Sequence, residues 1–221
     1  MKRLILAAAL AVIPAYASAN VVTFTFTDCN TSSGCSPQTG NNFGTVTVTD
    51  TVAGQVTVDA HISPYTWAAT GLIGLAWTLA SGVGAPTISG LSPAADWSPI
   101  VGSPLTSFNT DGMGTQQYGT DFIGPNNQIS QDLIFTLTAT GLSSASFIPG
   151  GVANDTGVAY NFIADICTNV GGCSGSGGTG LVGAGVAPVP APIVGAGIPG
   201  LVISCLGLLG LSRRRRAKQA A

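Results

Sequence analysis

The distribution of charged side chains constrains this chain more than any other feature of its sequence. All seven lysines and arginines lie near the termini, at positions 2, 3, 213 to 216 and 218, and all nine acidic residues are aspartates between Asp28 and Asp165. The region between the basic ends therefore has a charge of about −9 and contains no Lys, Arg or Glu. Because a basic surface is the electrostatic requirement for binding nucleic acid, we expect no nucleic-acid partner.

Short alternating segments predict β-strands within this base-free region. Residues 21–27 and 45–49 alternate between apolar and polar side chains, and residues 55–62 place Val56, Val58, Ala60 and Ile62 on one face. Further apolar or alternating runs occupy residues 72–79, 132–140 and 158–166. Turn signals lie at residues 40–42, 53–54 and 124–127. The sequence predicts an all-β fold, a jelly-roll-like antiparallel β-sandwich over residues 20–173.

Residues 81–128 are rich in proline and glycine and predict long loops at one end of the sheet in place of strands. Trp97, Phe108 and Tyr118 lie in this segment and are candidates for a platform that stacks on a sugar ring. The alternative interpretation is that these three aromatic side chains fill the end of the core.

The N-terminus has the pattern of a secretory signal peptide. Lys2 and Arg3 precede an apolar run over residues 4–13, and Ala17-Ser18-Ala19 matches the small-residue cleavage site. We expect residues 1–19 to be removed and the mature protein to begin at Asn20.

The C-terminus predicts a single membrane span. Residues 193–211 are uncharged and mostly apolar, and as a helix they reach about 28 Å, close to the thickness of a bilayer's hydrocarbon core. The cluster Arg213, Arg214, Arg215 and Arg216, within the tail 212–221, is expected to stay on the cytoplasmic side. Residues 174–192 read as a Gly/Pro-rich stalk between the span and the outer domain.

Four cysteines outside the span form two similarly spaced pairs, Cys29 with Cys35 and Cys167 with Cys173, each enclosing five residues. In an oxidising compartment two local disulfide rings are the simplest of the three pairings, while the crossed pairings require the first and last strands to be neighbours. A zinc site is the rival interpretation, but the five-residue gap exceeds the usual zinc spacing. We expect disulfides and no metal or cofactor.

The sequence contains few signs of catalysis. His61 is the one histidine and shares the polar face of a predicted strand with Asp59, a pattern that indicates either a general base or a solvated surface pair. The Gly-x-Ser-x-Gly elbow is missing, and no two aspartates stand out as a hydrolytic pair. We therefore expect that the protein is not an enzyme.

Two further motifs are weak. Asn109, Asp111 and Asp121 bracket a glycine-containing loop but lack the regular spacing of a calcium loop. Residues 175–180 match Gly-x-Gly-x-x-Gly, but this dinucleotide fingerprint works only between a strand and a helix, and glycine and serine are also typical of a flexible stalk.

The tail resembles the PEP-CTERM sorting signal of Gram-negative bacteria, on the residues Val189, Pro190, Ala191 and Pro192, the apolar span and the arginine cluster. Ala191 stands where that signal has glutamate. The resemblance implies an exported protein that an exosortase-like enzyme processes, anchored first in the inner membrane and then released to the cell surface or the medium.

We accordingly expect a structural or adhesive protein of a biofilm or exopolysaccharide matrix, with exopolysaccharide as a candidate partner. The alternatives are a carbohydrate-binding module that uses the loop aromatics and, third, a hydrolase acting on polysaccharide.

Overall fold

The computed structural model describes residues 19–29, 42–68, 74–100, 108–109, 112–123, 128–153, 157–167 and 179–186. The chain divides into two compact units, Asn20–Ala191 and a second made of Met1–Ala19 with Pro192–Ala221. Of the second unit only Ala19 belongs to the described residues, so the fold below is that of the first unit.

The described residues form strands and one 3₁₀ helix, in agreement with the predicted all-β class. The strands are β1 (Val21–Cys29), β2 (Gly44–Val52), β3 (Gln55–Ile62), β4 (Thr66–Ala68), β5 (Leu75–Leu79), β6 (Thr87–Ser92), β7 (Trp97–Pro99), β8 (Phe108–Asn109), β9 (Thr115–Gln116), β10 (Tyr118–Phe122), β11 (Gln128–Ile129), β12 (Leu133–Thr138), β13 (Phe147–Ile148), β14 (Phe162–Cys167) and β15 (Thr179–Val186); the helix is η2 (Ser144–Ser146). Among these residues no helix is long and apolar enough to cross a membrane, and the predicted span 193–211 lies outside them.

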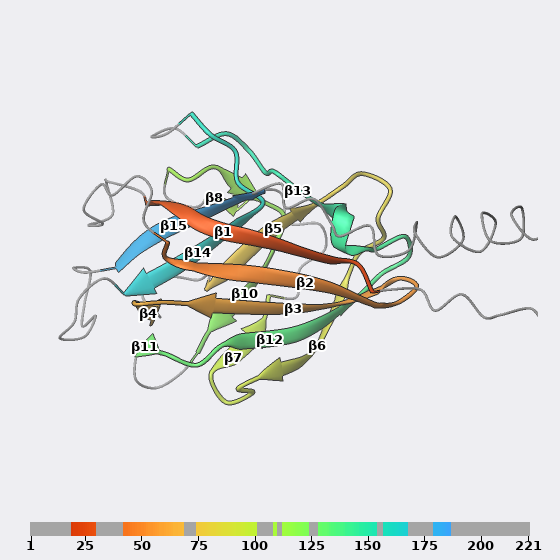
Figure 1. Ribbon diagram of the computed structural model, residues 1–221, viewed down its shortest axis with the longest axis horizontal. Coiled ribbons are helices and arrows are strands. Elements are labelled where there is room, and N and C mark those ends of the chain that lie inside the picture. The colour runs from red at the N-terminus through yellow and green to blue at the C-terminus, as the bar shows by residue number, and fades with distance from the viewer. Residues whose placement is uncertain are drawn as a thin grey trace, which may run out of the picture. The chain divides into compact units, whose positions relative to one another are not determined.

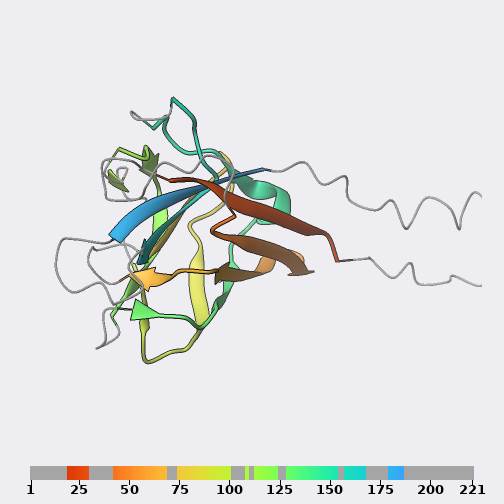
Figure 2. The ribbon, with the colours of Figure 1, turned by 60° about the vertical axis from the view of Figure 1, so that its left-hand side comes forward.

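One antiparallel sheet carries most of the structure. Its strands follow the order β6-β12-β3-β2-β1-β15-β14-β5-β10-β7, and the two edge strands β6 and β7 contact each other, so the sheet is nearly closed (Figures 1 and 2). The predicted sandwich of two separate sheets is thus replaced, in the described residues, by a single sheet that curves around one main core.

The alternation predicted for the first three strands is confirmed. Val56, Val58 and Ala60 of β3 are fully buried, while the side chains between them are half-buried or exposed, and the same pattern runs through β2. Gly54, with φ of 77°, occupies the predicted turn between these two strands, where a left-handed backbone favours glycine. Local pattern and turn chemistry together account for this meander.

The prediction that residues 81–128 form only loops is wrong, because β6, β7 and β10 lie there. The prolines that suggested loops occupy strand ends: Pro86 precedes β6, Pro93 follows it, and Pro99 is the last residue of β7. Since β6 and β7 are edge strands, a missing backbone N–H at these positions removes little from the sheet.

The prediction that residues 174–192 form a stalk is also wrong for Thr179–Val186, which is strand β15. This strand pairs on one side with β1, from Phe24 opposite Val186 to Cys29 opposite Val182, and on the other side with all of β14. The outer domain therefore extends beyond the predicted boundary at residue 173.

The small residues of β15 allow aromatic side chains to pack closely against this strand, which lies between β1 and β14. Ala184 is fully buried opposite both Phe26 and Phe162, and across it the rings of Phe24 and Phe162 meet edge to face at 4.9 Å. On the other face, a Cβ added at Gly183 would lie 2.5 Å from the ring of buried Tyr160. Glycine in a strand often marks such a close approach, so the glycines of β15 do not indicate a flexible stalk.

Strands β4 and β5 share one edge of β14. Trp67 of β4 lies opposite Ile166, and Leu75 of β5 lies opposite Ala164, so the chain leaves this edge after Ala68 and rejoins it at Gly74. The backbone N–H of Asp165 donates to the carbonyl of Gly74 at 3.0 Å where the pairing resumes. The two strands thus act as one interrupted strand.

The two glycines of β15 that differ in their surroundings test its central role. We expect Gly183→Ala to lower the free energy of unfolding by about 1–3 kcal/mol, because the new methyl group overpacks against the buried Tyr160 ring. Gly185→Ala is the matched control, since a Cβ there meets nothing within 4 Å. Urea denaturation of both variants measures the difference, and equal stability would contradict the packing described here.

Candidate functional site

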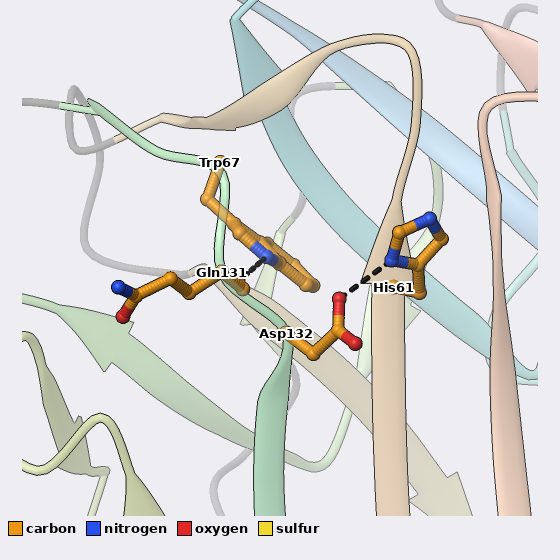
Figure 3. Close-up of polar contacts among 4 residues, drawn as sticks. All are labelled: His61, Trp67, Gln131 and Asp132. Atoms are coloured by element: carbon orange, nitrogen blue, oxygen red, sulfur yellow. Dashed lines mark hydrogen bonds and ion pairs between the residues drawn. The ribbon is translucent and has the colours of Figure 1, made fainter.

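An exposed pair of titratable side chains joins β3 to β12. Nδ1 of His61 lies 2.5 Å from Oδ1 of Asp132, and the two side chains are 51% and 43% exposed (Figure 3). The antiparallel pairing of Ala60 with Leu133 brings the two residues level on the outer face of the sheet. The sequence predicts His61 on this face, but its partner Asp132 lies 71 positions later in the chain, directly before β12.

Trp67 positions the carboxylate of this pair. Its indole Nε1 donates to the carbonyl of Gln131 at 3.1 Å, one residue before Asp132, and the indole itself is fully buried (Figure 3). A buried aromatic side chain has little rotational freedom, so this bond fixes the backbone that carries Asp132. The pair therefore has a rigid support.

Asp59, two residues before His61, completes the titratable cluster on this face. Burial raises the pKa of the Asp59 carboxyl, the nearby Asp132 carboxylate raises that pKa further, and His61 opposes both effects. Its buried Oδ1 has no hydrogen-bond partner within the described part of the chain. The protonated form of this carboxyl is therefore favoured relative to an aspartate in water.

The cluster holds one imidazole, that of His61, in a fixed orientation, and no nucleophile or metal ligand set accompanies it within the described residues. Within the described residues the imidazole makes no polar contact besides Asp132, and no group of three His, Cys, Asp or Glu side chains could hold a metal ion. The weak calcium motif is not assembled within the described residues. Asp111 and the side chain of Asn109 lie outside them. The third residue, Asp121, lies on β10, where burial raises the pKa of its carboxyl.

Cys29 and Cys167 are both disulfide-bonded. They cannot be bonded to each other, because β15 lies between their strands and two strand spacings amount to about 10 Å, beyond the Cα separation that a disulfide spans. One of the three pairings considered from sequence is thereby excluded. Cys35 and Cys173 lie outside the described residues, so the two local rings stay a prediction.

The proposed aromatic platform is not formed as expected. Trp97 is 2% exposed and packs edge to face against Trp67 and Phe122 at 5.1 and 5.2 Å, so its ring fills the core and cannot stack on a sugar. The side chain of Phe108 lies outside the described part. Tyr118 is half-buried and packs against the core from β10.

Tyr118 also lines a groove that sequence analysis did not detect. The groove has a volume of about 240 Å³ and lies at the seam between the edge strands, where its lining residues are Ala85, Pro86, Thr87, Ile88, Pro99, Ile100 and Tyr118. The lining comes from the start of β6 and the two residues before it, from the end of β7 and the residue after it, and from the first residue of β10. None of the lining side chains is charged, so the groove suits a neutral ligand.

The remaining predicted sites lie outside the described residues. They are Ala17 of the cleavage site and the sorting residues Val189, Pro190, Ala191, Pro192, Arg213, Arg214, Arg215 and Arg216. Ala19, next to the predicted cleavage point, is exposed just before β1. Comparison of the chain with protein-family models, with curated proteins and with solved structures finds no match.

The raised pKa of Asp59 predicts a pH-dependent effect of Asp59→Asn. A carboxyl whose pKa is raised on folding destabilises the folded state at pH values above that pKa, and the cost disappears below the ordinary value of 3.8. The variant should therefore raise the free energy of unfolding at pH 7, by less than about 1 kcal/mol because the carboxyl is partly solvated, and should match the parent protein at pH 3. Urea denaturation at both pH values tests this; a gain that persists at pH 3 would assign the effect to something other than charge.

Proposed function

We propose that this chain is an exported cell-surface or matrix protein with a structural or adhesive role, retained at first by its C-terminal span. The observation that carries the proposal is the participation of Cys29 and Cys167 in disulfides, which form and persist in oxidising compartments outside the cytoplasm. The signal-like N-terminus and the base-free, acidic outer region agree with it. In this proposal the mature domain begins at Asn20.

The proposed sorting step rests on the tail. Its Val-Pro-Ala-Pro motif, apolar span and arginine cluster resemble a PEP-CTERM signal, and we propose an exosortase-like processing enzyme as the partner. A small β domain with a Thr-rich outer surface and no assembled catalytic constellation among its described residues suits a structural role better than a catalytic one.

A second candidate function is recognition of a neutral saccharide, which the groove beside Tyr118 favours. An aromatic ring next to apolar walls offers the C–H faces of a sugar a stacking surface, and an uncharged lining avoids selecting ionic groups. This version of the carbohydrate-binding hypothesis moves the contact from Trp97, which is buried, to the seam between β6 and β7.

The export proposal predicts a trypsin-resistant mature protein. Because no Lys or Arg lies between Arg3 and Arg213, a species processed at both ends should remain uncut even when denatured and reduced. Intact mass of the protein isolated from the surface or medium should give a start at Asn20 and an end near Pro190. Ser130→Arg, an exposed position, supplies a control with a single tryptic site; a full-length tail found only in the inner membrane would contradict release.

The saccharide candidate predicts a loss of binding in Tyr118→Ala. We expect at least tenfold weaker signal on an array of neutral glycans, since the stacking surface is removed, whereas Tyr118→Phe should retain most of the binding. Thermal unfolding of both variants separates a lost contact from a lost fold. Equal glycan binding by folded Tyr118→Ala would exclude the groove as the binding site.

A further inference from the structure

The end of the sheet where the chain enters and leaves has an uncharged surface. The start of β1 and the final turn of the β2–β3 meander lie there, with η2 beside them, and β15 ends opposite Phe24, three residues from the start of β1 (Figure 1). Three connections close this end, residues 53–54, 80–86 and 139–143, and none contains a charged side chain. We call this surface the uncharged end.

Hydrogen bonds join these connections into one surface. The N–H of Ala139 donates to the carbonyl of Gly54 at 2.9 Å, and the N–H of Gly84 donates to the carbonyl of Thr140 at 3.0 Å. The nearest carboxylate, Asp50, is engaged, because its Oδ1 accepts the backbone N–H of Ser144 at 2.5 Å. The uncharged end is therefore a continuous, preformed surface.

Apolar side chains are exposed on this surface. Val52, at the end of β2, is 65% exposed, and Val21, at the start of β1, is 49% exposed. Ala53 and Ala85 are exposed beside them in the connections. The uncharged end thus offers small apolar side chains. The charges nearest to them are the Asp50 carboxylate, which is hydrogen-bonded to Ser144, and the α-amino group that the proposed start at Asn20 provides.

The opposite end of the sheet carries charge. Asp28 near the end of β1, Asp96 before β7, and Asp132 with His61 all lie there. Anionic lipid headgroups repel carboxylates, so an anionic membrane favours the orientation in which this acidic end points away from it. The charge distribution therefore selects the uncharged end as the one that faces lipid.

The chain length beyond β15 brings lipid within reach. Only residues 187–192 separate β15 from the predicted span at 193–211, and six extended residues cover at most about 20 Å. In the proposed precursor, a tether this short would keep the domain at a high effective concentration near the bilayer, which favours weak contacts between its valine and alanine side chains and the lipid.

We propose that the uncharged end rests on the lipid surface while the precursor is anchored, so that the acidic end faces outward. The inference rests on the proposed membrane retention of the tail. It assigns Val21, Val52 and the three connections as the membrane-facing surface.

Fluorescence quenching in vesicles tests the contact. The full chain carrying Val52→Trp is reconstituted into vesicles of phosphatidylcholine and phosphatidylglycerol, with or without brominated acyl chains. Ile123→Trp is the matched control, because Ile123 is 54% exposed and follows β10 at the acidic end. The native tryptophans, all buried, contribute the same background to both variants. We expect brominated lipid to quench the added emission of Val52→Trp at least twice as strongly as that of Ile123→Trp.

Equal quenching of the two variants in chains that float with the vesicles would overturn the lipid contact and leave membrane retention intact. Failure of the chains to float would overturn retention and the contact with it. A change in Val52→Trp emission that depends on protein concentration, without any effect of bromine, would assign the uncharged end to a second copy of the chain and overturn the lipid assignment.

Discussion

The insertion of β15 between β1 and β14 is the interaction on which the rest of the structure depends. These strands come from the beginning and the end of the domain, and β15 joins them into one sheet by pairing with β1 from Val182 to Val186 and with β14 from Thr179 to Ala184. Without β15 the main core would lie open between β1 and β14, exposing Phe24, Phe26 and Phe162 to water. Because the contacts between β15 and β1 join distant parts of the chain, forming them costs the loop-closure entropy of the long segment between them.

Aromatic side chains fill the core of a domain whose strands consist mostly of small residues. Thr, Val, Gly and Ala dominate the strands, and a few rings fill the space between them: Trp77 lies 5.4 Å from Phe135, and Phe147 stacks on Phe162 at 5.1 Å. Two buried polar side chains, Thr78 and Gln116, are held by hydrogen bonds. The amide of Gln116 accepts from Thr78 at 2.8 Å and donates to the carbonyl of Tyr160 at 3.0 Å.

The sequence predicted the elements whose information is local and missed those defined by distant partners. Alternation in residues 55–62 identified β3 and its buried face correctly. Glycine is typical of a flexible loop but also of a strand packed closely against a ring, as at Gly183. Proline is typical of a loop but also of the end of an edge strand, as at Pro93. Which of the two applies depends on neighbouring strands that are distant in the sequence. For the same reason the partner of His61 and the groove at Tyr118 could not be predicted, since both arise from strands far apart in sequence.

The interrupted strand formed by β4 and β5 has a consequence for how its register is set. Trp67 pairs with Ile166 and Leu75 pairs with Ala164, so the continuous strand β14 fixes the register of both pieces. A change in β14 therefore acts on two segments of the chain at once, whereas a change in β4 or in β5 acts on one part of the ladder.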